Sequence, residues 1–221
     1  MKILAVEFSS EQRSVAVVEQ LADGSSLQRG SAEEKNGRAT HAFHLTEEAL
    51  RQASIEREEI DCVAVGLGPG SYTGIRAAIA LAQGWQLARE TKLLGVSSVE
   101  CLAAQVFANG IRGVANLIVD AQRNEFYLAQ YELGENGVCE IESLHIVARA
   151  EVERRSVEGQ RIAGPGVAHF FKRAENLFPN AVMLGKIACG KTQFVPGENL
   201  EPIYLREISF VKAPAARVIL D

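Results

Sequence analysis

Residues 62–85 read CVAVGLGPGSYTGIRAAIALAQGW, and this stretch decides the fold class. Its first four residues are small and β-prone, which predicts a buried strand. A turn follows in which Gly66, Gly68 and Gly70 permit backbone angles that other residues rarely adopt. Ser71 and Thr73 are candidate caps for the helix that comes next. A buried strand, a glycine turn and a helix in this order indicate an α/β protein.

The helix predicted after this turn is apolar on two nearly opposite sides. At helical spacing its residues form two stripes, with Ile75, Ala78, Ile79 and Ala82 in one and Ala77, Leu81, Gly84 and Ala88 in the other. A helix that packs against one neighbour needs one apolar stripe. The second stripe therefore predicts a second neighbour, which could belong to another chain.

Composition places the chain among ordinary soluble globular proteins. It has 221 residues, of which 47% are hydrophobic and 23% charged, enough to bury a substantial core. A net charge of −5 argues against broad binding to phosphate backbones. No apolar run is long enough to span a bilayer, and residues 1–10 read as a first strand rather than a signal peptide. Four dispersed cysteines predict reduced thiols in the cytoplasm: Cys62, Cys101, Cys139 and Cys189.

The two halves of the chain repeat one pattern. Residues 3–18 predict a strand, a polar turn and a returning strand, with a third strand near Leu27, and residues 117–147 repeat this order. In that register Glu7 corresponds to Asp120. The Gly-Pro-Gly turn also recurs at residues 164–166, where a helix over 167–174 is expected to follow. We therefore expect an α/β fold of two subdomains, residues 1–109 and 110–221, with mixed sheets flanked by helices.

Two further helices are expected in the first half. Residues 40–53 have helical spacing with Thr40 as a candidate cap, and residues 98–108 follow Ser97, a helix-start residue.

The glycine turn is a candidate nucleotide contact through Gly68, Gly70 and Ser71, because a helix N-terminus attracts anions. The turn lacks the Lys-Ser/Thr ending of a P-loop and the spaced glycines of a dinucleotide site. A tight turn needed for close packing is the favoured interpretation.

Other chemistry-bearing residues form no complete set. Glu7 and Asp120 could face each other across a cleft and position a metal or water, but strand-end carboxylates also commonly cap turns. His41 and His44 lie one helical turn apart, and a metal site would need a third ligand. Ser71 is outside any G-x-S-x-G elbow. The sequence thus predicts neither a catalytic residue nor a metal site.

Several segments resemble one known family in the order in which they occur. Residues 67–85 and 93–105, LLGVSSVECLAAQ, closely resemble the signature of the bacterial TsaB (YeaZ) family. ILAVEFSS at 3–10, VDAQRNEFYLAQY at 119–131 and EPIYLRE at 201–207 fit the same family. One departure is Glu7-Phe8-Ser9, where the family usually has Asp-Thr-Ser, and it disfavours a nucleotide grip in the first half.

The resemblance implies a duplicated actin/Hsp70/sugar-kinase-like (ASKHA) fold and a role in making threonylcarbamoyladenosine (t6A) beside the anticodon of tRNA. It implies a non-catalytic scaffold and activator that pairs with TsaD, the related protein that carries the metal site and transfers the group. The ATPase TsaE would join the complex, and the chain alone would form a homodimer. It would meet tRNA indirectly. No cofactor would be required, although ATP or ADP could bind at the interface of the complex.

By the same resemblance, the helices at 40–53 and 73–89 form the interface with TsaD. The interface residues expected there are His41, Leu45, Ala49, Ile75, Ala77, Ala78, Leu81, Ala82 and Trp85. Two alternatives remain open from the residues themselves. One is an ATP-dependent small-molecule kinase that uses Glu7, Asp120 and the Gly-Pro-Gly turns, and the other is a metallopeptidase, for which no ligand set is evident.

Overall fold

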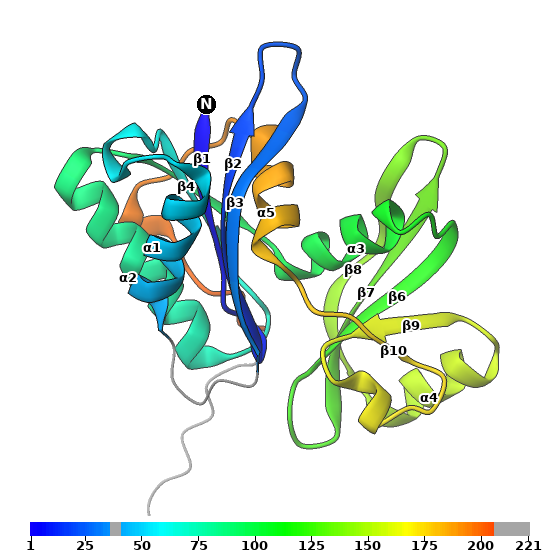
Figure 1. Cartoon of the computed structure of the whole chain (residues 1–221). Coiled ribbons are helices and arrows are strands. Elements are labelled where there is room, and N and C mark those ends of the chain that lie inside the picture. Colours follow the sequence, from blue (N-terminus) through cyan, green and yellow to red (C-terminus); the bar gives the residue numbers. More distant parts are fainter. Residues whose placement is uncertain (36–40, 206–221) are drawn as a thin grey trace, which may run out of the picture.

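The computed structural model describes residues 1–35 and 41–205. The chain forms two lobes, each built on a five-stranded mixed sheet (Figure 1). Within the described residues, no helix is both long and apolar enough to cross a membrane.

The first lobe has its sheet in the order β3-β2-β1-β4-β5. Its strands are β1 (Lys2–Glu7), β2 (Gln12–Gln20), β3 (Ser26–Lys35), β4 (Cys62–Gly66) and β5 (Lys92–Val96). Helices α1 (Ala42–Ala53) and α2 (Tyr72–Arg89) cover one face, and α5 (Ala181–Cys189) covers the other (Figure 1). Alternate residues of β1 point to opposite faces, so Leu4 packs under α1 and α2 whereas Ile3 packs under α5.

The second lobe repeats this sheet in the order β10-β9-β6-β7-β8. Its strands are β6 (Gly113–Asp120), β7 (Glu125–Gly134), β8 (Gly137–Ala148), β9 (Arg161–Gly164) and β10 (Glu175–Asn176). Helix α3 (Ser98–Ala108) packs on one face and lies between the lobes, while α4 (Arg149–Val157) packs on the other (Figure 1). The short 3-10 helices are η1 (Arg57–Glu59), η2 (Val167–His169) and η3 (Gly197–Asn199).

This topology confirms the expected duplicated α/β fold with mixed sheets. Each sheet begins with an antiparallel meander whose first strand then pairs in parallel with the fourth strand. Glu7 ends β1 and Asp120 ends β6, so the predicted correspondence of the two carboxylates is correct. Ser71 and Ser97 are the N-caps of α2 and α3, as expected.

Two expectations for the C-terminal half are corrected. The helix expected over 167–174 is only the three-residue η2, because Phe171 turns inward to pack against Phe126. The division at 109/110 separates the sheets but misplaces residues 181–205, which return to the first lobe. There α5 covers the second face of the first sheet, Leu200 enters the core under α2, and the Ile203 amide donates to the Leu67 carbonyl at 2.8 Å.

The start of the first helix also differs from the expectation. Helix α1 begins at Ala42 with His41 as its N-cap residue, and His41 makes no side-chain capping bond. The expected cap Thr40, and the last two residues of the 201–207 segment, lie outside the described residues.

Candidate partner-docking site

One side of the predicted interface lies inside the first lobe. Ile75, Ala78 and Ala82 of α2 are completely buried beneath the helix. Leu45 and Ala49 of α1 are buried in the same cluster, which also holds β1 and β4 side chains. The expectation that these five residues meet a partner is therefore corrected, because the lobe's own sheet already covers them.

The opposite side of α2 is open to solvent. Ala80, Gly84 and Ala88 are exposed, while Leu81 and Trp85 are half-buried. Together with α1 they line a groove of about 530 Å³. The groove is bounded by Phe43, Thr46, Glu47, Arg57, Glu58, Ala80, Leu81, Gly84, Trp85, Ala88 and Arg89. We call this surface the α1/α2 groove.

Among the predicted interface residues, Leu81 and Trp85 line the α1/α2 groove, and Ala77 lies half-buried one turn before Leu81. Sequence reasoning missed Phe43, whose side chain is 79% exposed. The sequence feature that could have identified Phe43 is its place on the side of α1 opposite Leu45. At Gly84 a Cβ atom would meet nothing within 4 Å, so a partner's backbone could approach α2 closely there.

Charges surround the apolar floor of the groove. Arg57 Nη2 lies 2.7 Å from Glu47 Oε1, and Arg89 Nη1 lies 3.2 Å from Glu58 Oε1. Such exposed pairs add little stability, but charged rims orient a partner. Within the described residues the buried Trp85 Nε1 has no hydrogen-bond partner. A buried donor without an acceptor is costly and calls for an explanation.

The two helix-start histidines line a second pocket, between β3 and α1, so the predicted interface residue His41 is not part of the α1/α2 groove. His41 Nδ1 is 2.9 Å from Glu34 Oε1, and His44 is exposed. In residues 1–35 and 41–205, no group of three metal-ligating side chains is close enough to hold an ion.

The glycine turn before α2 packs directly on the turn that joins β1 and β2. A Cβ atom at Gly70 would overlap the Ser9 carbonyl, and one at Gly74 would overlap the Phe8 carbonyl. The Ser71 amide donates to the Ser9 carbonyl at 2.7 Å, and Ser71 Oγ accepts from the Gly74 amide at 3.3 Å. This arrangement supports the interpretation of a packing turn. A nucleotide contact at Gly68, Gly70 and Ser71 stays a prediction.

Glu7 and Asp120 are held in separate turns. Glu7 is completely buried and accepts from the Ser9 amide at 2.7 Å and from Ser98 Oγ at 2.8 Å. Burial raises the pKa of the Glu7 carboxyl. Asp120 accepts from the Gln122 amide at 2.8 Å. Glu7 therefore joins β1 to the start of α3, and each carboxylate serves its own turn.

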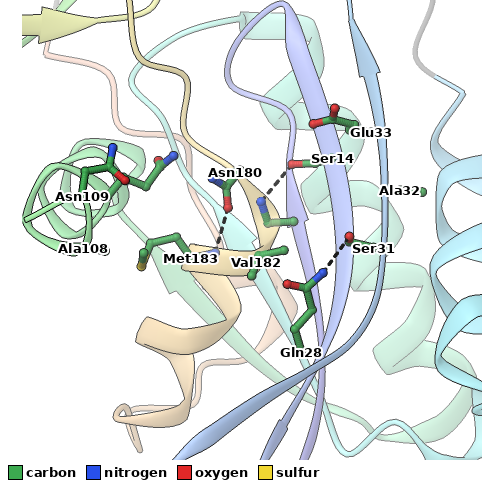
Figure 2. Close-up of a pocket in the computed structure, with 12 residues that line it drawn as sticks. Ser14, Gln28, Ser31, Ala32, Glu33, Ala108, Asn109, Asn180, Val182 and Met183 are labelled. Carbon is green, nitrogen blue, oxygen red and sulfur yellow. Dashed lines mark hydrogen bonds between the residues drawn. The ribbon is translucent and has the colours of Figure 1, made fainter.

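A polar cavity of about 360 Å³ lies where α5 begins, beside the end of α3 (Figure 2). Ser14 Oγ accepts from the Ala181 amide at 2.9 Å, and Asn180 Oδ1 accepts from the Met183 amide at 2.9 Å. These polar groups cap α5 and hold it on the first sheet. These polar groups therefore have a structural role where the two lobes join.

Comparison with known proteins agrees with these features. Residues 38–191 match the family model described as TsaD, tRNA N6-adenosine threonylcarbamoyltransferase. The tRNA threonylcarbamoyladenosine biosynthesis protein TsaB of Escherichia coli (strain K12) is 29% identical, over 97% of this chain and 99% of that protein. TsaB of Bacillus subtilis (strain 168) is 27% identical, over 63% of this chain and 58% of that protein.

A solved structure also shows the similarity to the TsaB (YeaZ) proteins. YeaZ from Pseudomonas aeruginosa superposes with a TM-score of 0.75 at 26% identity, covering 92% of this chain and 99% of that one. The resemblance carried by residues 67–105 is thus confirmed. The chain belongs to the TsaD family of tRNA N6-adenosine threonylcarbamoyltransferases, and it is similar along nearly its whole length to the TsaB (YeaZ) proteins.

Proposed function

We propose that this chain acts in t6A biosynthesis as a non-catalytic partner that docks on TsaD and holds it in an active arrangement. The names of its relatives support the pathway, and they favour it over a small-molecule kinase or a metallopeptidase. In this role the chain works in the cytoplasm and needs no cofactor of its own. A nucleotide at the interface of the complex stays a prediction.

The observation that carries the proposal is the α1/α2 groove. Phe43 of α1 is 79% exposed and lines the groove together with small and apolar residues of α2, and Leu87 of α2, which lies outside the groove lining, is 89% exposed. Monomeric proteins rarely leave a contiguous apolar surface of this kind uncovered. Because Gly84 and its small neighbours permit close approach, a helix of TsaD would pack on this surface ridge into groove.

The same surface would also form the expected self-dimer when TsaD is absent. A second copy presents an identical groove, and a two-fold axis lets each copy cover the other. TsaE would then join the complex of this chain with TsaD. The self-dimer and the TsaD complex would compete for one surface, so TsaD should dissociate the dimer.

The position of Glu7 supports a role without catalysis. A catalytic carboxylate must reach its substrate. Glu7 is completely buried, and both of its oxygens already accept hydrogen bonds. The α1/α2 groove contains carboxylates only at its rim, where Glu47 and Glu58 are paired with arginines.

Reconstitution tests the proposal directly. The purified chain is added to TsaD, TsaE and the other components of the pathway, and t6A is measured in tRNA. We expect the chain to co-purify with TsaD and to raise the yield of t6A. The proposal fails if the chain neither binds TsaD nor changes modification. ATP hydrolysis by the isolated chain that Asp120→Asn abolishes would instead support the kinase.

A further inference from the structure

Two of the four tyrosines in the chain lie together at the N-terminal end of α2. Tyr72 is the first residue of α2, and its ring stacks on that of Tyr204 with centroids 5.6 Å apart and planes 24° apart. The Arg76 guanidinium lies 5.0 Å from the centre of the Tyr72 ring and donates to the Tyr72 hydroxyl at 2.7 Å.

This cluster is open to solvent. The side chains of Tyr72 and Tyr204 keep 58% and 44% of their surface exposed, and Arg76 is exposed as well. Among the residues that the structure describes, Arg76 pairs with no carboxylate, whereas Arg57 and Arg89 on the groove rim each do. The guanidinium therefore keeps charge available for an anion.

Anchoring of the C-terminal segment does not explain the exposed rings. Leu200 is buried in the first core, and the Ile203 amide already bonds the Leu67 carbonyl, so this segment is fixed without the aromatic stack. The two rings stack on each other, Arg76 lies over the Tyr72 ring, and both tyrosines still keep exposed surface. Exposed tyrosine faces beside an arginine are what unpaired bases stack on.

We propose that Tyr72, Tyr204 and Arg76 form a binding platform for an unpaired RNA base, with Arg76 contacting the adjoining phosphate. The proposal rests on the proposed function, which brings this chain to tRNA, and it departs from the expectation that tRNA is met only indirectly. Because the chain has a net charge of −5, stacking rather than long-range attraction supplies most of the binding.

Fluorescence anisotropy tests the platform with a labelled hairpin RNA that has an unpaired anticodon-type loop, and with a duplex RNA of equal length. The hairpin should bind more tightly than the duplex. Tyr72→Leu and Tyr204→Leu should each weaken hairpin binding by about 5- to 150-fold, the loss expected for one stacked base. Tyr72→Phe and Tyr204→Phe keep the rings and should bind nearly as the wild type does. Arg76→Gln should reduce, by about one, the steepness with which the logarithm of the binding constant falls with the logarithm of salt concentration.

Matched controls come from the second lobe. Phe170→Leu and Arg173→Gln change a partly exposed aromatic residue and an exposed arginine outside the cluster, and they should leave RNA binding unchanged. Thermal unfolding checks that each variant is folded. Excess ATP should fail to displace the hairpin, since a site for a free nucleotide would be emptied by it.

Three results would overturn the platform: equal binding of hairpin and duplex, wild-type affinity in folded Leu variants, or full displacement by ATP. Co-purification with TsaD is measured separately for each variant. If Tyr72→Leu weakens TsaD binding and leaves RNA binding intact, the cluster belongs to the protein interface. If TsaD binding is absent altogether while the Leu variants lose RNA, the proposed docking fails and the platform stands.

Discussion

The two lobes share one sheet topology and differ in what covers it. In the first lobe, α1 and α2 bury one side against the sheet and leave the apolar α1/α2 groove on the other. In the second lobe, the face opposite α3 is covered by α4, whose Arg155 is only 8% exposed. Arg155 donates to Glu142 at 2.7 Å, to Glu151 at 2.7 Å and to Asn116 at 2.9 Å.

This difference shows how a duplicated fold can divide its tasks. Strand order is the same in both lobes, and helices cover both faces of each sheet. The outer surfaces of the helices can differ. Over residues 1–35 and 41–205, the buried Trp85 Nε1 and Glu34 Oε2 of the first lobe have no hydrogen-bond partner, whereas the buried Arg155 of the second lobe is paired with Asn116 and Glu142. The open groove and the unpaired Trp85 N–H support the proposed docking on the first lobe.

The largest effect is expected from Ala78→Arg, which places a charge in the first core. Ala78 is completely buried, and an unpaired buried charge should lower the free energy of unfolding by about 4 kcal/mol or more. Urea unfolding measures the loss. A folded Ala78→Arg variant of wild-type stability that only fails to bind TsaD would mean that this side of α2 faces outward.

A smaller effect is expected from Arg155→Met in the second lobe. The change leaves Asn116 and Glu142 without their shared donor, and because Glu142 is partly exposed the cost should be about 2 kcal/mol. Arg154→Met, which removes only exposed ion pairs on α4, should cost less than about 1 kcal/mol. TsaD binding should be unchanged in both. A loss of TsaD binding in folded Arg155→Met would contradict the division of tasks.

Gly84→Ala should stabilise the isolated chain by about 1 kcal/mol, because alanine favours a helix interior and the site is open. The matched change Gly74→Ala, in the same helix, should destabilise it, since a Cβ there overlaps the Phe8 carbonyl. Thermal unfolding of both variants gives the comparison. If both variants were stabilised, or both destabilised, the inner and outer sides of α2 would be wrongly assigned.

The smallest effect concerns one half-buried carboxylate in each lobe. Hydrogen bonds from Arg51 lower the pKa of Glu48 on α1 to about 2, and those from Arg154 lower the pKa of Glu151 on α4 to about 2. A lowered pKa stabilises the fold above the unfolded value near 4.5, and this contribution is lost as the pH falls through about 2. Carbon NMR titration of the two carboxyls should show both low midpoints. Midpoints near 4.5 would mean that these arginine–glutamate ion pairs do not form in solution.

Much of the fold was predictable from local pattern. The sequence of residues 62–85 predicted a strand, a tight glycine turn and a helix capped by Ser71, and the structure has these elements. The repeat placed Glu7 and Asp120 at equivalent strand ends, because it preserves the alternation of apolar residues that each sheet needs.

The candidate site was only half predictable. Helical spacing identified both apolar stripes of α2. Because both stripes are rich in alanine, their composition does not show which one packs against the sheet. The inner position of Ala78 is decided by the sheet beneath it. The return of α5 to the first lobe is a long-range contact, and a nine-residue helix carries no local signal of its destination.

Binding of TsaD to the Gly84→Arg variant tests the central claim most directly. Arginine at Gly84 projects into open space above α2, so the chain should fold normally while the groove is blocked. By titration calorimetry we expect affinity for TsaD to fall about 30-fold or more, as for an interface hot spot. Val157→Arg, at an 81% exposed apolar residue of α4, should bind as the wild type does. Wild-type affinity in folded Gly84→Arg would contradict docking at the α1/α2 groove.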